Sequence, residues 1–165
     1  MLEVYVLVTK KPSIGILLLN ALVLSLAIVS LLLSCSIPFA ILLAVIFAGM
    51  YYFIFMETRL EYEYSYFDGD VRFAKIMNKS RRKNLRSYSM EEVVILAPAG
   101  DASVEKYEKD SKIKRKNYTS RFRNVPYYEM VVRAGEGMIL VKFEPDDAYL
   151  DAVCMKYGHK VVRRS

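Results

Sequence analysis

The stretch SLLLSCSIPF, residues Ser30–Phe39, decides how the rest of the chain is interpreted. Its LLSC portion matches the end of a bacterial lipoprotein signal, in which the cysteine becomes a lipidated N-terminus and the following chain lies outside the cell. Alternatively, SCSIP is typical of a tight bend between two membrane helices, which leaves the following chain in the cytosol. The two interpretations predict opposite compartments for most of the protein.

Apolar runs flank this stretch on both sides. Residues 14–33 and 37–56 are each 20 residues long and contain no charged side chain. At 1.5 Å per residue each run reaches about 30 Å, the thickness of the hydrocarbon core of a bilayer. A lipoprotein signal has an apolar region of about 7–15 residues followed by a polar chain, so the pattern favours the bend. We expect a membrane α-helical hairpin, with Pro38 in the first turn of the second helix.

Charged residues are concentrated after the apolar runs. Of the 24 basic and 18 acidic residues, 22 and 17 follow residue 56, which gives this part a net charge of +5. Lys10, Lys11 and Arg59 flank the two helices, whereas the bend carries no charge. By the positive-inside rule, both termini should be cytosolic and the bend outside. The predicted location is therefore the cell membrane, with two spans.

Small residues recur on one face of the second run. Ala40, Ala44 and Ala48 are spaced four apart, and Ala21 and Ser25 give the first run a comparable pair. Small residues let helix backbones approach closely, so these five positions form the predicted helix-packing surface.

Three polar residues of the chain bear on the membrane interpretation. Asn20 is either a functional intramembrane residue or the donor of an interhelical hydrogen bond, and the absence of any intramembrane charge favours the second. Cys35 and Cys154 would lie on opposite sides of the membrane, so no disulfide is expected.

Alternating apolar and polar residues begin at residue 59. In RLEYEYSYF, Leu60, Tyr62, Tyr64 and Tyr66 share one face, which predicts a half-buried strand. The following Asp-Gly predicts a tight hairpin to a second strand, VRFAKIM. Further strands are predicted at RKNLRSYS, VVILAP, KIKRKNYTSRF, YYEMVVRA and MILVKFE, and helices at ASVEKYEKD and PDDAYLDAVCMKYG. We expect an α+β soluble domain, a bent antiparallel sheet of about seven strands with a C-terminal helix.

Two apolar helices combined with YEYSYFDGDVRFAKI, KSRRKNL, ILAP and VKFEPDDAYLDAV resemble a family of small bacterial membrane proteins of unassigned function. The soluble part of that family is similar to a pleckstrin-homology-like domain. The resemblance implies a bent seven-stranded sheet with a C-terminal helix, and it implies no activity. The predicted organisation is a juxtamembrane segment at 1–13, transmembrane helices at 14–33 and 37–56, and a cytosolic domain at 57–165. Residues 1–9 are compatible with either a strand or an interfacial helix.

The sequence contains no recognisable catalytic or metal-binding motif. His159 is its one histidine, and the HExxH, CxxC, nucleophile-elbow and phosphate-loop patterns do not occur. Glu61 and Glu63 are paired carboxylates, but residues at this spacing usually solvate the outer face of a sheet. We therefore expect a protein that is not an enzyme and that binds no cofactor or metal.

Two basic clusters, at residues 72–86 and 112–123, contain no acidic residue. Each cation near an anionic membrane contributes about 1 kcal/mol, so we predict a membrane-anchored module that contacts anionic phospholipid headgroups or a protein partner. The same charges are equally compatible with a role in topology and solubility alone. The residues expected to contact lipid or phosphate are Lys79, Arg81, Arg82 and Lys83, followed by Lys114, Arg115 and Lys116.

Two other kinds of partner follow from the pattern. An accessory subunit of a larger membrane complex would use the alanine stripe against another protein's helix and a sheet edge against a partner strand. The stretch KIKRKNYTSRFR interleaves cations with aromatic residues, as nucleic-acid-binding surfaces do. A membrane anchor and the lack of a recognised nucleic-acid-binding module disfavour that partner.

Overall fold

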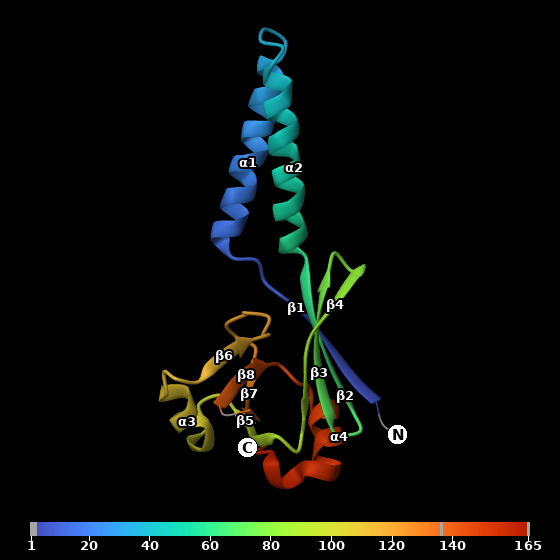
Figure 1. Ribbon diagram of the computed structural model, residues 1–165, viewed down its shortest axis with the longest axis vertical. Helices are drawn as coiled ribbons and strands as arrows, with labels where there is room; N and C mark the ends of the chain where they lie inside the picture. The colour runs from blue at the N-terminus through green and yellow to red at the C-terminus, as the bar shows by residue number, and fades with distance from the viewer. Residues whose placement is uncertain (1–2, 136, 165) are drawn as a thin grey trace.

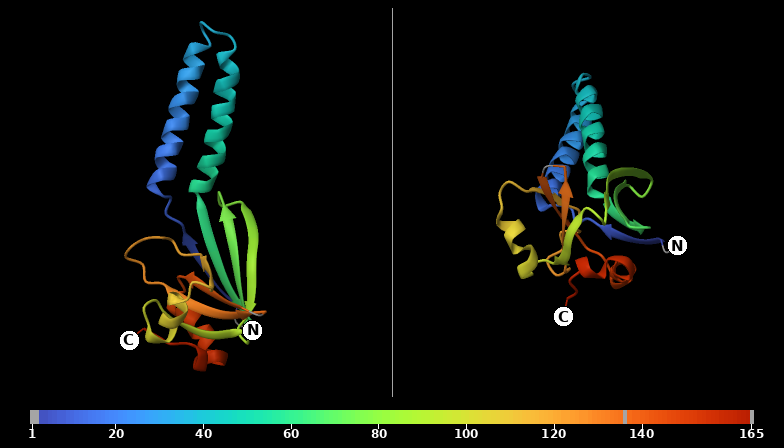
Figure 2. Two further views of the ribbon diagram at one scale, coloured as in Figure 1. Left: turned by 60° about the vertical axis from the view of Figure 1, so that its left-hand side comes forward. Right: turned by 60° about the horizontal axis from the view of Figure 1, so that its bottom comes forward.

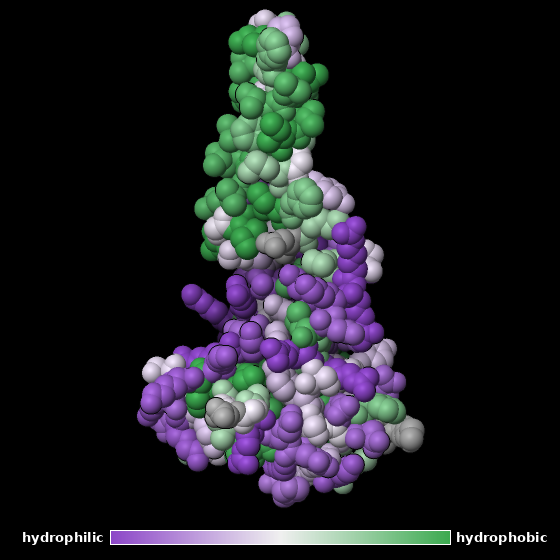
Figure 3. Space-filling view, viewed as in Figure 1, coloured by the Kyte–Doolittle hydropathy of each residue, from purple (hydrophilic) through white to green (hydrophobic). Residues whose placement is uncertain are grey.

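The computed structural model describes residues 3–135 and 137–164, and the molecule has two parts (Figures 1 and 2). Two long helices, α1 (Ile14–Leu33) and α2 (Ala40–Thr58), lie side by side and antiparallel. A domain rich in β-strands lies at one end of the pair, and the turn between the helices lies at the other. The surface is hydrophobic over the helices and largely hydrophilic over the domain (Figure 3).

The first helix coincides with the predicted apolar run, whereas the second begins three residues later and ends two residues later than predicted. α1 follows Ser13, whose Oγ accepts a hydrogen bond from the Ile16 N–H at 3.3 Å. α2 begins at Ala40 instead of Ile37, because the preceding residues form a turn in which the Ala40 N–H donates to the Ile37 carbonyl at 2.9 Å. By length and composition, α1 is the one helix among the described residues that could cross a membrane, and the apolar part of α2, Ala40–Met56, is shorter.

The contact between the helices differs from the predicted small-residue stripe. Ala40 and Ala44 are buried in it, whereas Ala48, Ala21 and Ser25 lie exposed on the outer surface of the pair. The reason is geometric, since a strict four-residue repeat drifts around a helix of 3.6 residues per turn, while alternating steps of three and four stay on one face. The side chains along the contact, which are at least partly buried, are Ile16, Asn20, Val23, Ala27 and Ser30 on α1 and Ala40, Ala44, Phe47 and Tyr51 on α2.

The described residues of the domain form two four-stranded sheets. The first is antiparallel throughout, with the order β1 (Glu3–Thr9), β2 (Leu60–Phe67), β3 (Asp70–Met77) and β4 (Arg81–Ser89). The second has the order β5 (Val93–Pro98), β7 (Tyr128–Ala134), β8 (Gly137–Phe143) and β6 (Lys114–Asn117). Helix α3 (Ala102–Lys109) packs on the outer face of the second sheet. Helix α4 (Asp147–Tyr157) and a 3₁₀ turn, Gly158–Lys160, complete the domain.

This arrangement corrects the prediction of one sheet with about seven antiparallel strands. Residues 3–9 form an eighth strand, which settles the conformation of that segment, while Met1 and Leu2 lie outside the described residues. Strand β6 pairs with β8 in parallel. A long loop leads from the end of β6 to the start of β7, and β7 runs antiparallel to β8. Strands β4 and β5 belong to different sheets, since Met90 between them is fully buried and its N–H donates to the Gly69 carbonyl at 2.7 Å.

The helical pair is an insertion between two neighbouring strands. Thr9 at the end of β1 pairs with Glu61 near the start of β2, and the Lys10 N–H donates to the Leu60 carbonyl at 2.8 Å. The domain therefore contains residues from both sides of the helices. A boundary at residue 57, as the sequence suggested, would remove one strand of the first sheet.

Aromatic side chains fill the core between the two sheets and α4. Tyr64, Phe73, Phe143 and Tyr149 are at most 1% exposed, and the Phe143 ring centroid lies 5.4 Å from those of Tyr64 and Phe73. The face of β2 predicted to be buried is buried. The predicted hairpin after it is also present, as a tight turn at residues 68–69 with φ values of 48° and 96°.

Candidate functional site

Four segments that are far apart in the sequence meet where α1 and α2 join the domain. The Lys11 N–H donates to the Ser120 carbonyl at 2.7 Å, which brings the loop after β6 to the start of α1. The Asn78 N–H donates to the Arg59 carbonyl at 2.9 Å, which ties the β3–β4 turn to the end of α2. These bonds fix the base of the helical pair on the domain.

Cations from all four segments surround this junction. Lys11, Arg121 and Arg123 line a shallow pocket of about 460 Å³ beside the first turn of α1, together with Ser13 and Phe122. Arg59 lies between α2 and β2, and the β3–β4 turn contributes Lys79 and Arg81. We call these six residues the basic collar: Lys11, Arg59, Lys79, Arg81, Arg121 and Arg123.

The charges of the basic collar are not neutralised within the described part of the chain. None of its six side chains forms an ion pair with a carboxylate whose side chain the structure describes. Two of them rest on aromatic rings: Lys11 Nζ lies 5.5 Å from the Phe122 ring centroid, and the Arg59 guanidinium lies 4.7 Å from that of Phe55. Such contacts orient a cation without cancelling its charge, so the collar can attract an anionic surface.

Buried polar groups position the loop that carries Arg121 and Arg123. The Tyr64 hydroxyl donates to the Tyr118 carbonyl. The buried Glu144 carboxylate accepts hydrogen bonds from the N–H and the hydroxyl of Ser120, at 3.0 and 2.8 Å. Arg121 follows with φ of 65°, a left-handed conformation that costs a non-glycine residue about 1 kcal/mol. Lys79 in the β3–β4 turn has φ of 56° and the same cost, so two collar residues occupy backbone positions that glycine would occupy more easily.

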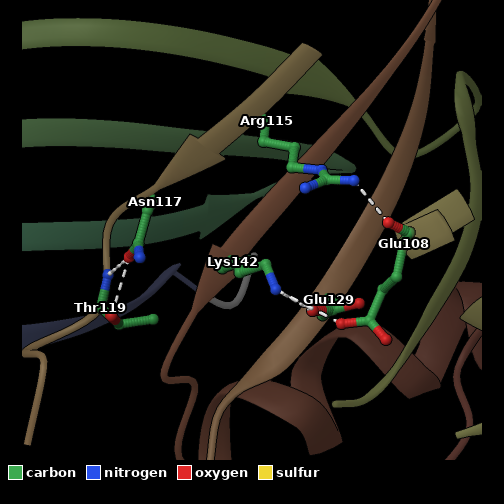
Figure 4. A network of polar contacts seen from close by, with 6 residues as sticks. All are labelled: Glu108, Arg115, Asn117, Thr119, Glu129 and Lys142. Carbon is green, nitrogen blue, oxygen red and sulfur yellow. Dashed lines mark hydrogen bonds and ion pairs between the residues drawn. The ribbon is translucent and has the colours of Figure 1, made fainter. Parts of the chain in front are cut away.

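A second constellation of charges lies on the outer face of the second sheet (Figure 4). Lys142 on β8 places its Nζ 2.6 Å from Oε1 of Glu129 on β7 and 3.3 Å from Oε1 of Glu108 on α3. Glu129 is fully buried. Burial, and then the neighbouring Glu108, raise the pKa of Glu129 to about 7, although Lys142 opposes the shift. Hydrogen bonding to Glu129 and the nearby Lys142 lower the pKa of Glu108, although burial opposes this.

This constellation joins α3 to the sheet. The Arg115 guanidinium donates to the Glu108 carbonyl, which ties β6 to the same helix. Among the described residues there is no group of three or more His, Cys, Asp or Glu side chains that could hold a metal.

The structure separates the residues predicted to contact lipid. Lys79 and Arg81 lie in the collar. Arg82 forms an ion pair with Glu63, and Lys83 lies opposite Lys75 on the neighbouring strand. Arg115 is engaged with α3, while Lys114 and Lys116 are exposed on β6 and do not line the pocket beside α1.

Sequence reasoning assigned no lipid contact to four collar residues, namely Lys11, Arg59, Arg121 and Arg123. Lys11 and Arg59 border the apolar runs, and this position was the one signal that could have identified them. The basic segment 112–123 was also considered as a nucleic-acid surface. Its Tyr118 is buried against Phe73, with ring centroids 4.9 Å apart, so that ring is not available to stack on a base.

A family described as Bacterial PH-like domain (DUF6106) matches residues 2–163. The chain belongs to this family. The match includes β1 and both helices as well as the strands that follow, in agreement with a domain built from both sides of the helical insertion. No curated protein and no solved structure matched the chain.

The family assignment confirms the resemblance to bacterial pleckstrin-homology-like proteins that the sequence motifs indicated. It also agrees with a domain of antiparallel strands and a C-terminal helix. The family description states no ligand or activity, so the function has to be argued from the site itself.

Proposed function

We propose that the chain is a non-enzymatic, membrane-anchored interaction module whose basic collar contacts anionic phospholipid headgroups at the inner leaflet. In this proposal α1 and α2 span the membrane as a hairpin, and both termini are cytosolic. The observation that carries it is the position of the collar: six cations without described carboxylate partners surround the point where two apolar helices leave the domain.

The dimensions of the helices support this placement. α1 has 20 residues and a length of about 30 Å, which matches the hydrocarbon core. The apolar part of α2 is at the short end of the range for a span, and Lys and Arg side chains at its domain end can extend to the headgroups. Lys10, Lys11 and Arg59 lie at the domain end of the pair, and the turn at the other end has no charge, which favours a cytosolic domain.

The energy available from the collar is sufficient to hold the domain against the lipid. Each Lys or Arg within a Debye length of an anionic surface contributes about 1 kcal/mol. The collar lies directly at the end of the helices, so its side chains would lie at headgroup level as soon as the helices are inserted. Reversing the charge of two collar residues should therefore remove at least about 2 kcal/mol of attraction.

The test uses the full chain in phospholipid vesicles. We call the loop that carries Arg121 and Arg123 the collar loop. Since the sequence has no tryptophan, Phe122→Trp introduces a single reporter in this loop, where Phe122 is 45% exposed. Quenching of this tryptophan by lipids with brominated acyl chains should increase with the proportion of phosphatidylglycerol. It should decrease when the salt concentration rises from about 0.1 M to about 1 M, because the Debye length falls from about 10 Å to about 3 Å.

A charge-matched pair of variants separates contact from general electrostatics. In the reporter background, Arg121→Glu with Arg123→Glu should abolish the dependence on phosphatidylglycerol. Lys114→Glu with Lys116→Glu makes the same change in net charge on β6 and should leave the dependence intact. Equal effects of the two pairs, or no dependence on anionic lipid at low salt, would leave the collar with a role in topology alone.

A second function, that of an accessory subunit in a larger membrane complex, is favoured by strand β1. This strand is an edge of the first sheet, and its Tyr5 and Leu7 are 66% and 54% exposed. An unpaired, apolar edge is suited to accept a partner strand. Leu7→Lys should then abolish co-purification with the partner, whereas the two collar reversals should not affect it.

A further inference from the structure

A groove lies where the last turns of α2 meet the β3–β4 turn, on the other side of the junction from the pocket at α1. It encloses about 600 Å³. Its lining is apolar or aromatic apart from a single cation, and the residues are Tyr52, Phe53, Ile54, Met56, Met77 and Arg81.

The two walls of the groove are fixed to each other by backbone pairing. Met77 is the cross-strand partner of both Leu60 on β2 and Arg81 on β4. The Asn78 N–H donates to the Arg59 carbonyl at 2.9 Å, so the turn is held against the end of α2. The groove is therefore part of the folded junction, and a ligand would find it already formed.

The two ends of the groove differ in chemistry, with apolar and aromatic side chains on α2 and a cation on the domain side. Tyr52 and Phe53 on the α2 side are 56% and 73% exposed, so nothing in the described protein covers this wall. Arg81 at the domain side is exposed and contacts no described carboxylate, whereas the next residue, Arg82, is paired with Glu63. An apolar wall on α2 with an unneutralised guanidinium at its base is complementary to a molecule with an acyl chain and a phosphate.

We propose that this groove binds one anionic glycerophospholipid, with its phosphate on Arg81 and an acyl chain along Phe53 and Met56. The inference rests on the proposed function, because it requires the domain end of α2 to lie at headgroup level. A guanidinium can donate two parallel hydrogen bonds to a phosphate, which gives the site a preference for the headgroup as well as for the chain. The apolar wall continues onto the exposed surface of α2, where the surrounding molecules are lipids.

The test uses the full chain in neutral detergent micelles, where no anionic membrane surface exists. Phe53→Trp places a single tryptophan in the groove wall, and brominated phosphatidylglycerol and brominated phosphatidylcholine are titrated separately. Phosphatidylglycerol should quench the tryptophan at about a tenth of the mole fraction that phosphatidylcholine needs, as expected for one charge-assisted contact. Arg81→Gln should remove this preference, Arg81→Lys should keep part of it, and Lys83→Gln, which loses the same charge on the same strand, should keep all of it.

A second reporter distinguishes a site from the lipid that surrounds any membrane helix. Phe39 at the opposite end of α2 is 81% exposed, and Phe39→Trp should show no preference between the two lipids. Equal quenching of the groove reporter by both lipids, or the same preference at both reporters, would overturn the proposal. The vesicle experiment replaces Arg121 and Arg123 and leaves this groove unchanged, so a failure of the groove proposal can be distinguished from a failure of the proposed function.

Discussion

Replacing Glu129 by glutamine should stabilise the domain above neutral pH and flatten its dependence on pH. Glu129 is fully buried between α3 and the second sheet, beside Glu108 and Lys142. Its pKa is raised from 4.5 to about 7 by burial and by Glu108. The folded domain therefore binds this proton more tightly than the unfolded chain does, and ionising Glu129 in the folded state has an energetic cost.

The sign and the size of the effect follow from the shift. Between about pH 4.5 and pH 7 the folded state holds more protons at Glu129 than the unfolded state, so its contribution to the free energy of unfolding falls as the pH rises. Above about pH 7 the contribution is constant. At about 1.4 kcal/mol per pKa unit, the shift from 4.5 to about 7 corresponds to at most about 3.5 kcal/mol. The pKa of Glu108 is lowered, so its contribution has the opposite sign and is lost as the pH falls below about 4.5.

The amide of a glutamine has the same shape as a protonated carboxyl group and never ionises. Glu129→Gln should therefore raise the free energy of unfolding at about pH 8 by up to about 3.5 kcal/mol and remove the decline between about pH 4.5 and pH 7. The assay is denaturant unfolding of the full chain in neutral detergent, followed by the near-ultraviolet circular dichroism of the buried tyrosines at several pH values.

Glu105→Gln is the matched control, because Glu105 is exposed on α3, the helix that carries Glu108, and pairs with Lys109 one turn away. It should change the free energy of unfolding by less than about 0.5 kcal/mol at every pH. If Glu129→Gln destabilised the domain at pH 8, the ion pair between Glu129 and Lys142 would outweigh the cost of burial, and the reasoning would be wrong.

Three further predictions concern the fold. Replacing residues 11–59 by Asn-Gly, which joins the paired ends of β1 and β2 by a two-residue turn, should give a domain with dispersed amide resonances, whereas deleting residues 1–59 should not. Gly69→Ala should lower the free energy of unfolding by about 1–3 kcal/mol, because φ is 96° and the new Cβ would lie 2.9 Å from Oη of Tyr157. Tyr157→Phe in that background should restore part of the loss, and no restoration would rule out the clash. Asn20→Leu should strengthen the helical pair by about 1 kcal/mol in detergent, since the buried Asn20 Oδ1 has no described hydrogen-bond partner, and weakening would reveal a partner for Asn20.

Local patterns were sufficient to predict much of the fold. The alternation in RLEYEYSYF and the following Asp-Gly predicted β2, its buried face and the hairpin to β3, because both signals are contained in a few consecutive residues. The strand β1 could not be assigned in the same way. Its seven residues pair with a strand that lies about 50 residues later. Nothing within the segment identifies that partner, so the sequence alone does not distinguish a strand from an interfacial helix.

The candidate site was harder to predict, because clustering in sequence is not clustering in space. Arg81 and Arg82 are neighbours in a strand, so their side chains point to opposite faces, one toward the groove at α2 and the other toward Glu63. The basic collar instead combines residues that are up to about 110 positions apart, such as Lys11 and Arg123. The tertiary fold brings these residues together, and the hydrogen bonds of Lys11 to Ser120 and of Asn78 to Arg59 hold them there.

The insertion of the helices between β1 and β2 bears directly on how weak charges could hold the domain on lipid. A domain attached through one flexible linker loses orientational freedom each time it contacts a surface, and this loss opposes binding. Here two covalent connections leave the domain side by side, and hydrogen bonds at Lys10 and Lys11 fix the first of them to β2 and to the collar loop. The collar therefore faces the helix ends in the folded state itself. Contacts worth about 1 kcal/mol each would then not be offset by the cost of orienting the domain, so a modest set of cations would be enough for the lipid contact that we propose.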